Sequence, residues 1–212
     1  MTTSQTRNFE VFVTPLFDGY IGDLNFNATI EQTKNIIDQV LDALNQLLLA
    51  NKTHNDLKPR NVLYRRIGNS YDIKICDFGQ AGKLGGTPGW TAPVFLNERK
   101  PGKEDIYSVG WIILFLLCHS KELFHSLRNN SIEDMTRSWI TRFRSLPEID
   151  LVSKMIDLDT PLTVDEVKNE WILTKSNVKM IDKSRLLALG VPAGDLVLQS
   201  IVRFVRIISI IK

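Results

Sequence analysis

Cysteine is scarce in this chain of 212 residues, which contains only Cys76 and Cys118. Both lie in apolar runs, so we expect two buried free thiols, as is usual in a reducing compartment. An excess of one charge is missing too, because the formal net charge is only +2. A balance this close to neutral does not favour nucleic acid or an acidic membrane surface as the main partner. These features predict an intracellular protein, in the cytoplasm or the nucleus.

Apolar runs long enough to cross a membrane are also missing. The most apolar internal run, Val109–Cys118, is far shorter than the roughly 20 residues that a membrane-spanning helix needs. We therefore expect a buried core helix there. The first residues, MTTSQTRN, are polar and form no secretory signal. The stretch 196–212 is apolar, but Arg203 and Arg206 near its middle argue against a transmembrane span.

This C-terminal stretch has a pattern of its own. Polar residues recur at every third position, namely Ser200, Arg203, Arg206, Ser209 and Lys212. Three interpretations stay open: packing against the rest of the domain, a helix or interface that contacts a partner, and an interfacial membrane anchor.

What is present is an ordinary globular balance, with 43% apolar and 24% charged residues, which predicts one compact domain. Residues 9–17 are rich in β-branched and aromatic types and predict a strand that ends near Pro15. Turn residues follow over 18–22. Apolar residues then recur at three- and four-residue steps over 29–49, which predicts a helix with Asn27 as its cap.

Two short segments, 61–65 and 71–76, predict a β-hairpin because RIGNS between them has turn chemistry. Residues 79–93 hold five glycines and two prolines, which predicts a loop. The remaining helices are expected over 104–118, 131–144, 148–156 and 163–173. Thr163 and Glu166 form a capping box at the start of the last one. The expected fold class is mainly α (α+β), a helical bundle with one small hairpin.

One loop between the first helix and the hairpin carries the residue types that phosphoryl transfer needs. Within HNDLKPRN (54–61), Asp56 can accept the proton of a hydroxyl, Lys58 can meet a phosphate, and Asn61 can offer an oxygen to a metal. Asp77 follows the second hairpin strand and can supply a further oxygen to magnesium.

Four segments together resemble the eukaryotic protein kinase superfamily, in its serine/threonine branch. HNDLKPRN (54–61) is similar to the family's catalytic loop, and CDFG (76–79) is similar to its metal-binding motif. GTPGWTAPV (86–94) resembles the substrate-contact segment, and KEDIYSVGWIILFLL (103–117) resembles the buried central helix. The order and spacing of these four segments match those of the family. The resemblance extends over residues 9–174.

The resemblance implies the roles of the central residues. Asp56 would be the catalytic base, and Lys58 would contact the phosphates of the nucleotide. Asn61 and Asp77 would bind magnesium, and Leu63 would form the floor of the adenine pocket. The implied cofactors are therefore ATP and Mg²⁺.

Other residues would support this centre. His54 and Phe78 would stack in the inner spine of the lobe, and Gly79 belongs to the metal-binding motif. Thr87 would place its hydroxyl near the catalytic aspartate. Asp105 would hydrogen-bond the backbone of the catalytic loop.

The resemblance also implies the domain organisation: an N-terminal segment with a hinge-like strand (1–28), a kinase-like large lobe (29–175) and the apolar and basic tail (176–212). The sequence shows no glycine-rich loop, strand lysine or helix glutamate before the hinge-like strand, so no complete small lobe is expected. Either the chain is truncated or the gene model has lost that lobe. On its own, the chain is expected to bind magnesium–ATP weakly or not at all.

Three further departures from the family pattern occur together. Asn55 replaces the arginine that reads a phosphate on the activation segment, and residues 80–85 of that segment offer no hydroxyl to phosphorylate. Val94 replaces a glutamate, and Pro161 or Leu162 takes the place of its arginine partner. Because both halves of a buried ion pair are lost together, the change can be nearly neutral.

The leading hypothesis is an ATP- and magnesium-dependent serine/threonine protein kinase, truncated and weakly active, with protein substrates. The alternative is an inactive kinase-like regulator that docks onto a partner kinase or its substrate. A small-molecule phosphotransferase of similar fold is a third hypothesis, although the segments 86–94 and 103–117 argue against it.

Overall fold

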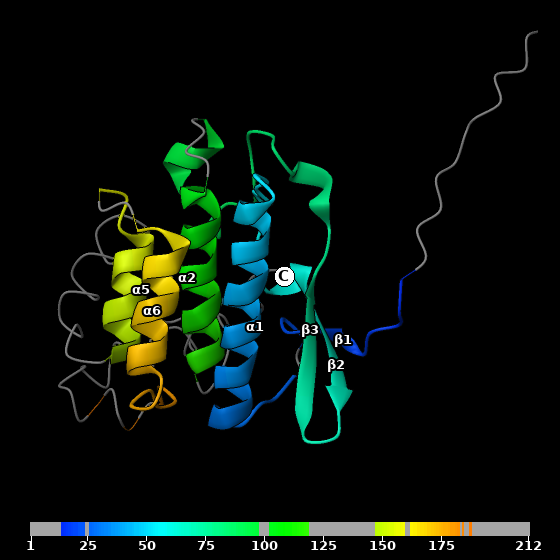
Figure 1. The fold of residues 1–212 in the computed structure, drawn as a ribbon, viewed down its shortest axis with the longest axis vertical. Coiled ribbons are helices and arrows are strands. Elements are labelled where there is room, and N and C mark those ends of the chain that lie inside the picture. The colour runs from blue at the N-terminus through cyan, green and yellow to red at the C-terminus, as the bar shows by residue number, and fades with distance from the viewer. Residues whose placement is uncertain are drawn as a thin grey trace, which may run out of the picture.

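The computed structural model describes residues 14–23, 26–97, 102–118, 147–159 and 162–182, together with residues 184 and 187. Its helices are α1 (Ile30–Leu49), α2 (Lys103–Leu117), α5 (Pro147–Ile156) and α6 (Val164–Thr174), and its strands are β1 (Gly19–Tyr20), β2 (Val62–Ile67) and β3 (Ser70–Ile75). Short 3₁₀ turns are η1 (Pro59–Asn61), η2 (Phe78–Gln80) and η3 (Pro93–Leu96). Figure 1 shows a small sheet on one side and the helices on the other, with α1 between the sheet and α6. Over these residues the predicted mainly helical fold with a small hairpin is confirmed.

Helix α1 forms where the apolar period predicted it, but its cap differs from the prediction. Thr29, and not Asn27, is the N-cap: its side chain accepts from the Gln32 backbone N–H, and Gln32 Oε1 accepts from the Thr29 N–H. Both residue types can cap, and the reciprocal bond from Gln32 decides between them. The apolar stripe of α1, including Ile36, Val40 and Leu44, is fully buried.

The predicted hairpin is confirmed as β2 and β3, whose antiparallel pairing runs from Val62 opposite Ile75 to Ile67 opposite Ser70. The first strand is one residue longer than predicted, the second has the predicted six residues, and the turn is only Gly68 and Asn69. Gly68 has a positive φ of 58°, a conformation that glycine adopts without penalty.

The strand predicted over 9–17 is not found at residues 14–17, and its earlier part lies outside the described residues. A strand of two residues, β1, instead occurs where turn residues were predicted, and it pairs with β2 through Tyr20 opposite Leu63. Asp18 extends this contact because its Oδ2 accepts from the Arg66 N–H at 2.7 Å. The N-terminal segment is thereby joined to the hairpin.

The outer edge of β3 is paired with a side chain from α1. Gln39 Nε2 donates to the Tyr71 carbonyl at 2.8 Å, and Gln39 Oε1 accepts from the Ile73 N–H at 2.9 Å. One amide therefore satisfies the two backbone groups that a neighbouring strand would otherwise satisfy. This contact fixes the helix against the hairpin.

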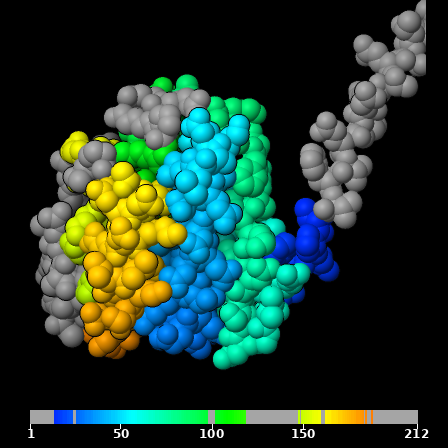
Figure 2. All heavy atoms as spheres, in the orientation of Figure 1, coloured from blue at the N-terminus to red at the C-terminus, as the bar shows by residue number. Residues whose placement is uncertain are grey.

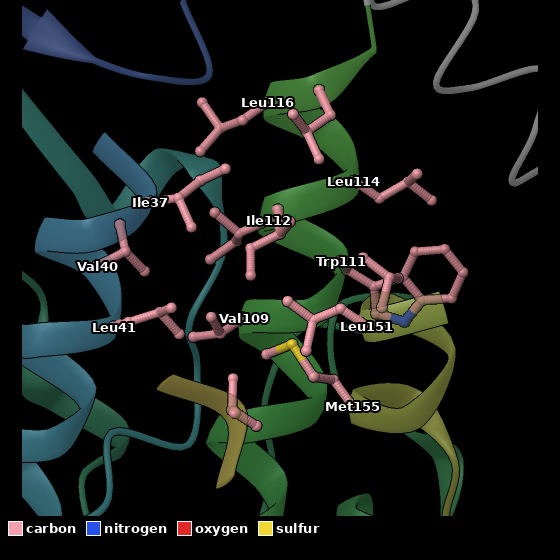
Figure 3. Packing of buried hydrophobic residues seen from close by; sticks show 14 of the residues in the cluster. Ile37, Val40, Leu41, Val109, Trp111, Ile112, Leu114, Leu116, Leu151 and Met155 are labelled. Carbon is pink, nitrogen blue, oxygen red and sulfur yellow. The ribbon is translucent and has the colours of Figure 1, made fainter. Parts of the chain in front are cut away.

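Helix α2 lies in the core, and nearly all of its residues are buried. Figure 3 shows Val109 and Ile112 of α2 facing Val40 and Ile37 of α1. On another side of α2, Leu151 and Met155 of α5 pack near Trp111 (Figure 3). Helices α2 and α5 approach closely at Gly110, where an added Cβ would lie 3.0 Å from Met155 Cβ.

Helix α6 has the predicted capping box, because Thr163 Oγ1 accepts from the Glu166 N–H and Glu166 accepts from the Thr163 N–H. It packs beside α1, as the space-filling view in Figure 2 shows. The buried Trp171 donates through Nε1 to Asp38 of α1 at 2.7 Å, and Lys175 pairs with the same carboxylate. These contacts join α6 to α1.

Some predictions lie outside the described residues, namely the helix over 131–144 and the tail 196–212. Both cysteines are free, but only Cys118 is buried; Cys76 is half-buried, because it lies at the end of β3 beside an exposed segment. In the described parts of the chain, no helix has the length and apolar character to span a membrane.

Candidate functional site

The predicted catalytic loop, residues 54–61, follows α1 and is held by a carboxylate at the start of α2. Asp105 Oδ2 accepts from the His54 N–H at 2.7 Å, and Asp105 Oδ1 accepts from the Asn55 N–H at 2.9 Å. Burial raises the pKa of the Asp105 carboxyl, although these two hydrogen bonds oppose the rise. The loop backbone is thus fixed at two adjacent residues.

Three side chains of the site form a closed set of hydrogen bonds. Lys58 Nζ donates to Asp56 Oδ2 at 2.6 Å and to Thr87 Oγ1 at 2.7 Å. The Thr87 hydroxyl donates in turn to Asp56 Oδ1 at 2.6 Å. The structure therefore brings together a carboxylate, an ammonium and a hydroxyl from two segments 31 residues apart.

His54 lies beneath this set and is fully buried. Its Nδ1 accepts from the Asp56 N–H at 3.3 Å, so the proton lies on Nε2, which donates to the Cys76 carbonyl at 2.9 Å. Both ring nitrogens are engaged with backbone groups. His54 therefore joins the catalytic loop to the end of β3 and has no nitrogen left for proton transfer.

Asn61 and Asp77, the predicted metal ligands, lie on neighbouring segments, because the Cys76 N–H donates to the Asn61 carbonyl at 3.0 Å. Asn61 Nδ2 donates to the Asp56 backbone carbonyl at 2.8 Å, which fixes the orientation of its amide. Asp77 is exposed and has a left-handed backbone with φ of 63°.

These two residues offer oxygen ligands, which is the donor type that magnesium prefers. In the part of the chain that the structure describes, no group of three or more His, Cys, Asp or Glu side chains forms a metal cluster. Two protein ligands nevertheless fit magnesium, since this ion usually keeps several waters and takes its remaining oxygens from phosphates. The donor set therefore fits the implied metal.

The remaining predicted residues surround this centre less tightly. Phe78 contacts His54 with tilted rings whose centroids lie 4.7 Å apart, and its side chain is 48% exposed. Gly79 follows it in η2 and is exposed. Leu63 lies in the middle strand, β2, and is half-buried. Burial and the Asp77 carboxylate together raise the pKa of the Cys76 thiol.

Asn55 is the residue whose contribution sequence reasoning missed. It has a positive φ of 65°, and asparagine tolerates this left-handed conformation better than most residues. Its Nδ2 donates to the Lys83 carbonyl at 2.7 Å, and Lys83 Nζ donates to the Gly79 carbonyl at 2.8 Å. The short activation segment is thus held directly by Asn55, where the family has a phosphate-reading arginine.

Gly86 lies against the same residue. A Cβ at this position would collide with Thr91 Oγ1 and would lie 2.8 Å from the Asn55 carbonyl oxygen. Because the φ of Gly86 is 133°, a side chain would also strain the backbone. The segment therefore approaches the catalytic loop so closely that it brings the next residue, Thr87, to Asp56.

Val94 and Leu162 are two of the positions at which the resemblance implies the loss of an ion pair. Val94 and Leu162 are both partly buried and pack against the hydrophobic core. Neither position leaves a charge without a partner, which is why the joint loss can be tolerated.

Comparison with known proteins shows the family of this chain. The family model described as "protein kinase domain" matches residues 16–171. The chain is 30% identical to the probable serine/threonine-protein kinase 2 of Plasmodium falciparum (isolate K1 / Thailand) over 196 residues, which cover 73% of this chain and 38% of that protein. It is 32% identical to serine/threonine-protein kinase D2 of Rattus norvegicus over 154 residues, covering 68% of this chain and 17% of the relative.

A third relative is calcium/calmodulin-dependent protein kinase type 1 of Caenorhabditis elegans, 36% identical over 112 residues, which cover 49% of this chain and 32% of the relative. The chain belongs to the protein kinase family. It spans less than two-fifths of the length of these curated relatives.

Proposed function

We propose that this chain transfers the γ-phosphoryl group of ATP to serine or threonine hydroxyls of proteins. The observation that carries the proposal is the bonded set of Asp56, Lys58 and Thr87. Here a carboxylate already accepts from a hydroxyl at 2.6 Å, which is the contact that an acceptor hydroxyl needs.

In the proposed reaction, the acceptor oxygen forms a bond to the γ-phosphorus as the bond to the β-phosphate oxygen breaks. The hydroxyl proton passes to the Asp56 carboxylate, and ADP leaves with the electron pair of the broken bond. Lys58, 2.6 Å from Asp56, places a positive charge beside the transferred group, where negative charge must be stabilised.

Asn61 and Asp77 would hold magnesium, which when bound neutralises phosphate charge. Asn61 is prepared for this role because its Nδ2 is already committed to the Asp56 carbonyl. Asp105 keeps the loop in shape through the two backbone bonds at His54 and Asn55.

A second candidate function is a kinase-like docking module. The exposure of Phe78 (48%) and Leu84 (52%) favours it, because both apolar side chains lie beside the site and are available to a partner protein. We expect weak nucleotide binding in either case, since no Gly-x-Gly-x-x-Gly motif occurs in the 212 residues.

Two measurements decide between these functions. Phosphate transfer to a serine-containing protein substrate would be followed for the wild type and for Asp56→Asn, which keeps the shape of the side chain. Thermal unfolding with and without magnesium–ATP would be compared with Asp77→Ala. Transfer that Asp56→Asn abolishes supports the kinase. Transfer that persists in this variant contradicts the assigned base, and no transfer with no nucleotide-dependent stabilisation favours the docking module.

A further inference from the structure

The residue beside the predicted metal ligand Asn61 is a cation that the proposed reaction does not use. Arg60 is exposed and lies in η1, four residues after Asp56. Among the residues that the structure describes, no carboxylate lies within ion-pair distance of it. Most other cations of the described chain, such as Lys34 and Lys168, have carboxylate partners.

Arg60 is nevertheless held in place. Its guanidinium carbon lies 5.7 Å from the centre of the Tyr20 ring, a cation–π distance. Among the described residues, no hydrogen bond or ion pair uses the N–H groups of this guanidinium, so they are available to an acceptor.

The support beneath Arg60 is well ordered by hydrogen bonds. The Tyr20 N–H donates to Asp23 Oδ2 at 3.0 Å, which engages the acidic side chain of this turn with the backbone. The Gly22 N–H donates to the Pro59 carbonyl at 3.2 Å, next to Arg60 itself. The turn after β1 and the turn η1 are therefore bonded to each other, and Tyr20 and Arg60 project from these bonded segments.

We propose that Arg60 is a specificity-determining residue that recognises an acidic side chain of the protein substrate, close to the acceptor hydroxyl. This inference rests on the proposed function. An arginine whose edge is free suits a carboxylate because two parallel N–H donors match its two oxygens. Extended chain spans about 3.3 Å per residue, so an acid within about four residues of the acceptor can reach Arg60 when the hydroxyl is at Asp56.

The test measures peptide binding without nucleotide, so that its outcome does not depend on transfer. Fluorescent peptides of one serine in an alanine–glycine background would carry glutamate, lysine or phosphoserine on both sides of the serine. Fluorescence anisotropy would be compared for the wild type, Arg60→Gln and Arg60→Glu. Lys168→Gln is the matched control, since it removes one positive charge from α6, which α1 separates from the sheet (Figure 1).

We expect the wild type and Lys168→Gln to bind the glutamate peptide about two- to fivefold more tightly than the lysine peptide, as for an exposed ion pair. Arg60→Gln should remove this preference and Arg60→Glu should reverse it. An unchanged preference in Arg60→Glu overturns the proposal. If the wild type binds only the phosphoserine peptide more tightly than the lysine peptide, the proposal is also overturned, in favour of a phosphopeptide ligand.

Asp56→Asn separates this inference from the proposed function. If this variant keeps the preference while no enzyme form transfers phosphate, only the kinase proposal fails. If phosphate is transferred equally to the glutamate and lysine peptides, and both bind equally, only the inference about Arg60 fails.

Discussion

Replacing Asn55 tests whether one side chain holds the activation segment in place of a phosphate. The wild-type contact is a partly buried hydrogen bond of 2.7 Å from Nδ2 to the Lys83 carbonyl. Removing a partner from such a bond costs about 1 kcal/mol. The left-handed backbone adds a second cost of about 1–2 kcal/mol for an ordinary side chain such as alanine.

These two costs can be separated by two variants. Asn55→Ala loses the hydrogen bond and strains the backbone, so its free energy of unfolding should fall by about 2–3 kcal/mol. Asn55→Gly loses the bond but accepts the positive φ, so its loss should be about 1 kcal/mol smaller than that of alanine. Urea unfolding of the three proteins measures both differences.

Hydrogen exchange then locates the effect. In both variants the amides of residues 81–87 should exchange faster than in the wild type, because the segment has lost its contact to the catalytic loop. For amides in the middle of α6, the exchange rate should change only as much as the change in global stability requires. If Asn55→Gly exchanges like the wild type over 81–87, the side-chain bond does not hold the segment and the reasoning is wrong.

Three further changes test the packing around the site. Asp105→Ala should lower the free energy of unfolding at pH 7 by about 1–3 kcal/mol for each of the two backbone N–H donors that it leaves without an acceptor. The raised pKa of Asp105 means that the folded state holds its proton more tightly, so this group favours folding at acid pH. Its contribution declines as the pH rises from the unfolded pKa through the folded one. Urea midpoints measured upward from pH 3.5 should show this decline in the wild type and not in Asp105→Ala, and equal pH profiles would contradict it. Val94→Glu should lower the free energy of unfolding by about 1–3 kcal/mol, because it partly buries a charge against the core with no arginine to pair it. This loss should be larger than that of Val94→Ala. Equal melting temperatures for the two variants would show that the position is open to water. Gly86→Ala should be more harmful than Gly82→Ala, because both have positive φ but only Gly86 has atoms within 4 Å of an added Cβ; equal losses of stability in the two would contradict the close approach to Asn55.

The elements with a strong period could be predicted from the sequence. The apolar steps of α1 and the turn chemistry of the hairpin gave these elements nearly correct bounds, since each depends on local residues. The N-cap of α1 was predicted wrongly, because Asn27 and Thr29 are both residue types that cap a helix. Only the reciprocal hydrogen bond from the side chain of Gln32 decides in favour of Thr29. Strand β1 could not be predicted, because two residues are too few to show alternation.

At the site, the residue types of the catalytic loop could be recognised because they lie within eight positions. The contacts that hold the site could not, because they join residues far apart in the chain. Asn55 and Lys83 are 28 positions apart, and nothing in the sequence marks them as partners. The exposure of Phe78 is likewise a property of packing and not of a motif.

The hydrogen bonds of the Gln39 amide bear on whether a strand of another molecule can pair with this sheet. An exposed strand edge is where a sheet can recruit a strand from another molecule and begin to aggregate. By occupying the Tyr71 carbonyl and the Ile73 N–H, Gln39 closes the outer edge of β3 to such addition. On the other side of the described sheet, β1 has only two residues, so it offers a short edge for such addition. An added strand could pair with β3 only by displacing the Gln39 amide from these two backbone groups.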